Sequence, residues 1–228
     1  MTAIKFCGLT RPGDVELAIA LGVDYLGLVL AESPRRLSVA KAAELAAITR
    51  AGASTGVDAP RLVMLLRNQA PAWIDEAIAA VQPDLLQFHG DETQAQCRRH
   101  GMPYWKALGW AGGQAGQGSD DPLSIAGYPS AQALVLDGHA PGEAGGGGRA
   151  LDWSRWPRSR RRLVLAGGLT ADNVAGAIAM TRPFAVDVAS GIEQAPGIKD
   201  HQRMRAFVAA VRSADADADA AVAAPCPD

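Results

Sequence analysis

Short β-rich runs and amphipathic helical segments alternate eight times between residues 3 and 211 of this 228-residue chain. The β-rich runs are almost continuously apolar, as in DYLGLVLA, RLVMLL and RLVLAGG, which is typical of strands buried on both faces. Parallel strands need a crossover connection between them, and the helical segments supply it. Eight consecutive βα units therefore predict a TIM barrel, an α/β fold of the (β/α)8 type in a single domain.

A doubly wound parallel sheet is the alternative fold. It usually has fewer units, and its first strand leads into a glycine-rich dinucleotide-binding turn that CGLTRPG does not provide. We expect the barrel to span residues 1–212. Its fifth unit is the least regular, because the glycine-rich segment AGGQAGQGSDD precedes any helix around residues 121–127. Residues 213–228 are small, acidic and proline-containing, so we expect a disordered C-terminal tail.

Composition excludes several classes of function. The formal net charge is −2, which gives no electrostatic case for binding nucleic acid, and no apolar run is long enough to span a membrane. The three cysteines, Cys7, Cys97 and Cys226, are odd in number and lack the close spacing of a zinc site or redox pair. This pattern favours a protein of the reducing cytoplasm. The four histidines fall on unrelated elements, so we expect no metal site.

In a TIM barrel the active site lies at the C-terminal ends of the strands. The residues that the sequence places there, in chain order, are Cys7, His89, Lys106, Asp137 and Asp187, and Arg36 follows the second strand. A thiol, two carboxylates and an arginine could perform proton transfer on an anionic substrate. Each residue also has a plainer explanation: a free cysteine is often a small buried hydrophobic residue, and an arginine is usually solvated.

The loops after the seventh and eighth strands are where TIM barrels often hold a phosphate. Gly167 and Gly168 follow the seventh strand in AGGLTADN, and Ser190 and Gly191 follow the eighth in VDVASGIEQ. Glycines let backbone N–H groups approach an anion, although they also serve in ordinary tight turns. Two such loops at the two expected places predict a phosphorylated small-molecule substrate.

Five ordered segments carry a resemblance to a known family. They are KFCGLTRPGDVELAIALGVDYLGLVLAESPRRLS, LQFHGDE, LVLDG with GGGGRALDW, LAGGLTADNV, and PFAVDVASGIEQAPGIKD. Together they resemble the phosphoribosylanthranilate isomerases of tryptophan biosynthesis, from about residue 4 to residue 211. The resemblance implies a cofactor-free TIM barrel. It also implies the conversion of N-(5-phosphoribosyl)anthranilate to its 1-deoxyribulose 5-phosphate isomer by an Amadori rearrangement.

The resemblance also implies roles for single residues. Asp137 would be the general acid that protonates the ribose ring oxygen, and Cys7 the general base that removes the proton from C2. Arg36 would hold the anthranilate carboxylate, and His89 and Asp187 would line the substrate site. The phosphate would be held by Gly167, Gly168, Ser190 and Gly191. An ordinary aspartate is ionised at pH 7. The loop formed by residues 139–153 would therefore have to cover Asp137 and raise its pKa, so that the side chain keeps its proton.

Some points stay open at the level of sequence. Position 189 is Ala where many members of the family have Ser, and GGGG occupies a loop that usually includes Ser or Thr. A histidine-pathway sugar isomerase performs the same rearrangement but has a carboxylate at the position of Cys7. A catalytically silent barrel that senses a sugar phosphate is a second alternative. The sequence does not distinguish a monomer from a homodimer.

Overall fold

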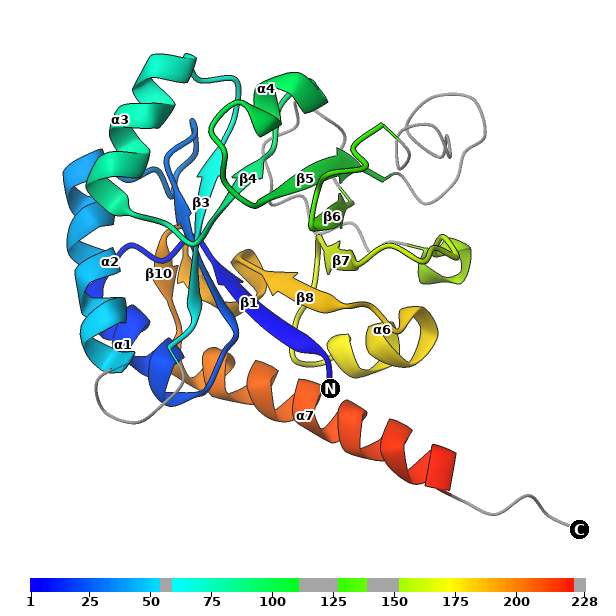
Figure 1. The fold of residues 1–228 in the computed structure, drawn as a ribbon. Coiled ribbons are helices and arrows are strands. Elements are labelled where there is room, and N and C mark those ends of the chain that lie inside the picture. Colours follow the sequence, from blue (N-terminus) through cyan, green and yellow to red (C-terminus); the bar gives the residue numbers. More distant parts are fainter. Residues whose placement is uncertain (54–58, 111–126, 139–151, 224–228) are drawn as a thin grey trace, which may run out of the picture.

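The computed structural model describes residues 1–53, 59–110, 127–138 and 152–223. Eight parallel strands close into a barrel in chain order, and helices surround it (Figure 1). The strands are β1 (Ala3–Cys7), β2 (Tyr25–Val29), β3 (Arg61–Leu66), β4 (Leu85–Phe88), β5 (Tyr104–Gly109), β6 (Ala133–Asp137), β7 (Leu163–Ala166) and β8 (Ala185–Val188). The predicted single-domain (β/α)8 fold is confirmed, and the doubly wound alternative is wrong.

Six α-helices occur in the described part of the chain, and several of them begin as the sequence chemistry indicates. They are α1 (Pro12–Ala20), α2 (Val39–Ala53), α3 (Pro71–Val81), α4 (Gln94–Arg98), α6 (Val174–Thr181) and α7 (His201–Ala223). Pro12 and Pro71 occupy first helical positions, where a missing N–H costs nothing. Thr93 and Gln96 form a capping box at the start of α4. The helix expected around residues 121–127 falls almost wholly outside the described residues.

Three shorter elements complete the described part of the fold. The 3-10 turn η1 (Trp153–Arg155) precedes β7, and η2 (Ser190–Ile192) follows β8. A small antiparallel hairpin, β9 (Glu193–Ala195) and β10 (Ile198–Lys199), comes directly after η2. The hairpin therefore lies at the C-terminal end of the last strand, next to where β1 ends.

Side chains alternate between two cores because successive residues of a strand point to opposite faces. One apolar cluster lies between the strands and the helices, and a second fills the barrel interior, where the rings of Tyr25 and Trp105 are 4.7 Å apart. Nearer the C-terminal ends of the strands, the interior becomes polar, with Lys5, Gln87 and Asp187 all buried. The apolar cluster fills the lower interior, and the polar layer lies above it. Together they place a site at the C-terminal ends of the strands, which we call the mouth of the barrel.

The barrel closes through β1 and β8, and α7 reinforces that closure. Ala3 to Phe6 pair in register with Ala185 to Val188. The Asp215 carboxylate in α7 accepts hydrogen bonds from the Thr2 backbone N–H at 2.9 and 3.0 Å and from its hydroxyl at 2.7 Å. The last helix thus holds the chain directly before the first strand.

The expected disordered tail needs correction over most of its length. Residues 213–223 continue α7, which Figure 1 shows running past the barrel, and only 224–228, with Cys226, lie outside the described residues. The alanines of this segment favour helix, and Asp215 is buried in its contact with Thr2. Composition alone predicts disorder for this segment, because Thr2, the partner of Asp215, is 213 residues away in the sequence.

The contact between Asp215 and Thr2 can be tested by its effect on stability. We expect Asp215→Ala to lower the free energy of unfolding by about 1–3 kcal/mol, because the buried Thr2 N–H and hydroxyl lose their acceptor. Urea denaturation measures the difference. Asp217→Ala is the matched control, since Asp217 is exposed on the same helix. Equal stability of the two variants would contradict a contribution from this contact.

Candidate active site

Cys7 ends β1 at the barrel mouth, where only 7% of the residue is exposed. The chain turns sharply after it, with Gly8 at φ 74° and its N–H donating to the Gly27 carbonyl at 2.9 Å. A side chain at Gly8 would overlap the aliphatic part of Arg35. The glycine therefore lets the strand end turn beneath Arg35 while the thiol stays inside the barrel.

Charged groups surround the Cys7 thiol. Lys5 lies one strand repeat below it, and the Lys5 ammonium is 2.8 Å from Asp187 Oδ2. Burial raises the pKa of the Cys7 thiol above its ordinary value and Asp187 adds to the rise, whereas Lys5 and Lys199 lower it. The thiol is thus protonated in the unliganded protein at neutral pH, with cations in place that favour its ionised form.

Asp137 and His89 face one another across the mouth. Asp137 ends β6, His89 directly follows β4, and His89 Nε2 is 3.7 Å from Asp137 Oδ2. Burial lowers the pKa of His89 below its usual value, although the Asp137 carboxylate acts in the opposite direction. His89 therefore presents a neutral ring at pH 7, which can donate or accept a hydrogen bond but adds no charge.

The two predicted phosphate loops lie against each other and against Asp137. Gly167 and Gly168 have φ values of 90° and 67°, and a Cβ at Gly167 would be 2.9 Å from Asp137 Oδ1. A Cβ at Gly191 would overlap the Leu169 carbonyl, so the loop after β8 packs directly on the loop after β7. Ser190 begins η2 beside this contact. The structure thus brings together all four residues predicted to bind phosphate.

The two adjacent arginines of SPRR have different surroundings. The Arg35 side chain is 11% exposed and makes two bonds to Glu193, from Nε at 2.8 Å and from Nη2 at 2.7 Å. The Arg36 side chain is 54% exposed and pairs with Glu32 at 3.2 Å. Arg35, whose charge acts on Cys7, lies at the mouth, whereas Arg36 lies on the surface. The structure therefore does not bring Arg36 together with the other predicted site residues.

Lys106 is another residue that the strand-end argument misplaced. Trp105 and Ala107 belong to the cluster inside the barrel, so Lys106 between them points outward. Its ammonium binds Glu92 Oε2 at 3.0 Å and the Gly90 carbonyl. Lys106 therefore ties β5 to the start of α4 and does not line the mouth.

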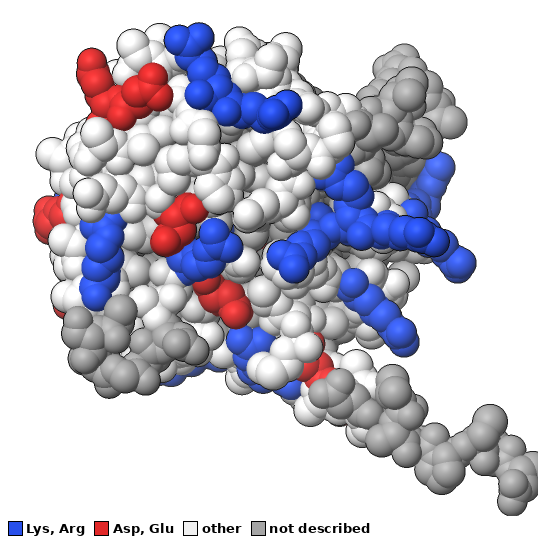
Figure 2. Space-filling model, in the orientation of Figure 1, with Lys and Arg blue, Asp and Glu red and all other residues white. Residues whose placement is uncertain are grey.

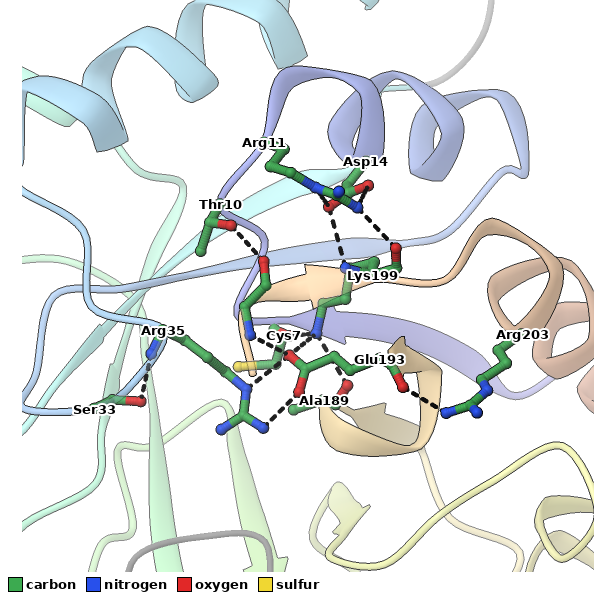
Figure 3. Close-up of polar contacts among 11 residues, drawn as sticks. Cys7, Thr10, Arg11, Asp14, Ser33, Arg35, Ala189, Glu193, Lys199 and Arg203 are labelled. Atoms are coloured by element: carbon green, nitrogen blue, oxygen red, sulfur yellow. Dashed lines mark hydrogen bonds and ion pairs between the residues drawn. The ribbon is translucent and has the colours of Figure 1, made fainter. Parts of the chain in front are cut away.

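Lys199 connects the separate parts of the mouth (Figure 3). Its buried ammonium donates to the Cys7 carbonyl at 2.6 Å, the Ala189 carbonyl at 3.0 Å and Glu193 Oε1 at 2.8 Å. Glu193 in turn holds Arg35, and both cations lower the pKa of Glu193 against the effect of its burial. The ends of β1 and β8, the hairpin and Arg35 thus share one network.

Sequence reasoning missed four residues of this site, namely Lys5, Arg35, Glu193 and Lys199. A signal was present for Lys5, because a lysine in an otherwise apolar strand, two residues before Cys7, must point to the same face. Glu193 and Lys199 offered no such signal. They follow the last strand in a segment whose hairpin becomes evident only in three dimensions.

The Lys199 network can be tested without any assay of activity. We expect Lys199→Met to lower the free energy of unfolding by about 3–5 kcal/mol, because a buried carboxylate loses one of its partners and two buried carbonyls lose their donor. Denaturant titration gives the value. Lys41→Met is the control, since Lys41 makes an exposed pair with Glu44 on α2 and should change stability little. A loss no larger than that of the control would contradict the network.

A different surface lies at the opposite end of the strands. A hollow there is lined by Trp156, Phe184 and several arginines around the beginnings of β7 and β8, among them Arg158, Arg160, Arg161, Arg162 and Arg182. Lys and Arg side chains gather on that side of the molecule in Figure 2. Because Cys7 and Asp137 end their strands, this basic hollow is separate from the mouth.

The mouth can perform acid–base chemistry on an anion. It offers a thiol, a neutral imidazole, several cations and the three carboxylates of Asp137, Asp187 and Glu193. No cluster of His, Cys, Asp or Glu suited to a metal ion occurs among the described residues.

No helix in the described part of the chain has the length and apolar character that crossing a bilayer requires.

The sequence is similar to that of known proteins along almost its whole length. Residues 4–210 match the family model described as N-(5'-phosphoribosyl)anthranilate (PRA) isomerase. A protein of Xanthomonas campestris pv. campestris (strain 8004), named N-(5'-phosphoribosyl)anthranilate isomerase, is 47% identical over 218 residues, covering 94% of this chain and 95% of the relative.

Solved structures give the same result. The phosphoribosyl anthranilate isomerase of Thermotoga maritima superimposes with a TM-score of 0.78 at 30% identity, covering 93% of this chain and all of that chain. A phosphoribosyl anthranilate isomerase in complex with reduced 1-(o-carboxyphenylamino)-1-deoxyribulose 5-phosphate gives a TM-score of 0.76 at 29% identity, with the same coverage.

Proposed function

The chain belongs to the N-(5'-phosphoribosyl)anthranilate isomerase family, and we propose that Cys7 and Asp137 carry the two proton transfers of its reaction. The enzyme is an aldose–ketose isomerase of tryptophan biosynthesis. It converts N-(5'-phosphoribosyl)anthranilate to 1-(2-carboxyphenylamino)-1-deoxyribulose 5-phosphate by an Amadori rearrangement. The expected function is confirmed, and the histidine-pathway and non-catalytic alternatives are set aside.

One observation carries the assignment of roles. The carboxylate of Asp137 packs directly on Gly167 of the proposed phosphate loops, and Cys7 opens into the same mouth from β1. A sugar phosphate anchored on these loops would therefore have its ring between a possible acid and a possible base. Backbone N–H groups of Gly167, Gly168, Ser190 and Gly191 would hold the phosphate.

The proposed reaction has two proton transfers. Asp137 in its neutral form donates a proton to the ribose ring oxygen, and the ring opens to an iminium ion as the C1–O bond breaks. The Cys7 thiolate then removes the proton from C2, and the C2–H electrons form the enolamine, which tautomerises to the ketone. The positive iminium favours ionisation of the nearby thiol when the base is needed. The loop proposed to cover Asp137 lies outside the described residues.

Other residues of the mouth suit the rest of the substrate. We assign the anthranilate carboxylate to Arg35 in place of Arg36, because Glu193 occupies Nε and Nη2 and leaves Nη1 for a second carboxylate. Asp187 Oδ1 is buried and, among the described residues, has no hydrogen-bond partner, so it can accept from the substrate amine. The neutral His89 ring can line the same pocket.

The base role predicts the behaviour of Cys7→Ser. We expect the variant to fold, because the change in volume is small, and to lose about 10²–10⁴-fold in kcat, since a hydroxyl is a far weaker base at pH 7. Steady-state fluorescence of substrate turnover measures this. Cys97→Ala, at a buried thiol on α4, should keep near-wild-type turnover. Wild-type kcat in Cys7→Ser would reject the role.

The acid role predicts a separation of binding from turnover in Asp137→Asn. The amide keeps the shape of the side chain but has no acidic proton to donate, so we expect almost no turnover with retained affinity for a reduced product analogue. Calorimetry gives the Kd and fluorescence gives kcat. Turnover comparable to wild type would assign ring opening to another donor, with Asp187 the next candidate.

The choice between the two arginines predicts opposite results for neighbouring substitutions. We expect Arg35→Ala to raise KM by the equivalent of about 2–3 kcal/mol and Arg36→Ala to leave KM unchanged. Arg35→Lys should recover only part of the loss, because an ammonium cannot bind two carboxylates side by side. A raised KM in Arg36→Ala with a normal KM in Arg35→Ala would restore the original assignment.

The remaining properties are proposals of the same kind. We propose one isomerase domain over residues 1–212, with α7 extending beyond it, and a cytoplasmic protein without nucleic-acid or membrane partners. The free thiols of Cys7 and Cys97 are consistent with a reducing compartment. One solved structure concerns monomers made from the dimeric enzyme of Thermotoga maritima, so this chain is a monomer or a homodimer.

A further inference from the structure

Lys5 is a fully buried cation inside a barrel whose lower interior is apolar. Placing an ammonium there carries a large desolvation cost, which an apolar residue of similar volume would avoid. Burial lowers the pKa of Lys5, but Asp187 and Cys7 outweigh this effect and raise it, so the cation persists. The proposed proton transfers do not use Lys5, and its presence therefore needs another explanation.

The surroundings of Lys5 are shaped to keep it near the thiol. Gly27 on β2 pairs in register with Cys7 on β1. A Cβ at Gly27 would lie 2.9 Å from Cys7 Sγ and 3.2 Å from Lys5 Nζ, so both groups occupy the space that a side chain would fill. The absence of a side chain at Gly27 thus lets the ammonium and the sulfur approach each other.

Hydrogen-bond counting distinguishes Lys5 from the other lysine at the mouth. An ammonium has three N–H donors, and Lys199 gives one each to the Cys7 carbonyl, the Ala189 carbonyl and Glu193. Lys5 gives one to Asp187 Oδ2, which, among the described residues, leaves it further donors beside the Cys7 sulfur. Lys5 is therefore the cation that can bond to the sulfur itself.

We propose that Lys5 is a positioning residue that favours ionisation of the Cys7 sulfur, so that the thiolate forms when the base is needed, with Gly27 providing the space and Asp187 the balancing charge. The proposal rests on the proposed role of Cys7. Lys5 does not touch the substrate and acts only through the sulfur.

The charges around Cys7 support this arrangement. Among the described residues the groups that face the thiol, from four separate segments, are Lys5 on β1, Asp187 on β8, Lys199 on β10, and Arg35 after β2. Glu193 is paired with both Arg35 and Lys199. Three cations thus face two carboxylates, and ionisation of Cys7 would bring this cluster to neutrality. The mouth is therefore built to accept one further negative charge at the sulfur.

The test is the pH dependence of Cys7 alkylation by iodoacetamide, followed by mass spectrometry of the Cys7 peptide. We expect Lys5→Met to move the midpoint upward by about one pH unit, which is a roughly tenfold lower rate at neutral pH. Asp187→Asn should move it downward, because the ammonium then acts on the sulfur alone. Cys97 in the same sample is an internal control, since burial raises its pKa to about 12.

Two further variants keep the test decisive if Lys5→Met does not fold. Gly27→Ala keeps every charge but separates sulfur and ammonium, so it should shift the midpoint upward as well. Lys5→Arg keeps the charge and should recover part of the shift. Lys41→Met, on the surface of α2, should give the wild-type midpoint.

Activity provides a second readout. In Lys5→Met we expect kcat to fall at pH 7 and to recover as the pH rises, with little change in KM, whereas damaged packing would not be relieved by alkali. Unchanged midpoints in Lys5→Met and Gly27→Ala, or shifts of the same sign in Lys5→Met and Asp187→Asn, would overturn the proposal. Full turnover in Cys7→Ser would instead reject the base role and leave the alkylation result standing.

Discussion

The three hydrogen bonds of the Lys199 ammonium hold the upper part of this barrel together. They join the carbonyl that ends β1, the carbonyl that follows β8 and the carboxylate that positions Arg35. Each of these groups belongs to a different part of the proposed site: the base, the phosphate loop and the carboxylate anchor. A single buried cation therefore sets the spacing between these three parts of the proposed site.

Missing side chains shape the site as much as those that are present. Gly27 leaves room for sulfur and ammonium, Gly167 lets the carboxylate of Asp137 lie against a loop, and Gly191 lets two loops touch. At these positions a Cβ would meet backbone or reactive atoms, which cannot move aside at low cost. The arrangement of the mouth therefore depends on close approaches of the backbone that only glycine allows.

Much of the fold and part of the site could be predicted from the sequence, for identifiable reasons. The alternation of apolar strands and amphipathic helices is local and long, so the barrel and the strand-end positions of Cys7, Asp137 and Asp187 followed from it. The family resemblance implies Arg36, whereas the contact with Glu193 that distinguishes Arg35 joins residues 158 positions apart and has no local signal in the sequence. The helical continuation past residue 212 does not follow from the local composition, because Thr2, the partner of Asp215, is remote in sequence.

The closure between β1 and β8 has a consequence for how the protein acquires activity. The contacts that complete the mouth join residues separated by most of the chain: Lys5 with Asp187, Cys7 with Lys199 and Thr2 with Asp215. Contacts of such long separation carry the largest loop-closure entropy and form late in folding. During synthesis the first seven strands can begin to pack, but Cys7 meets Lys199, and Lys5 meets Asp187, only after the last strand and the hairpin have emerged. An incomplete chain would thus present an ordinary buried thiol, and the reactive environment is a property of the finished barrel.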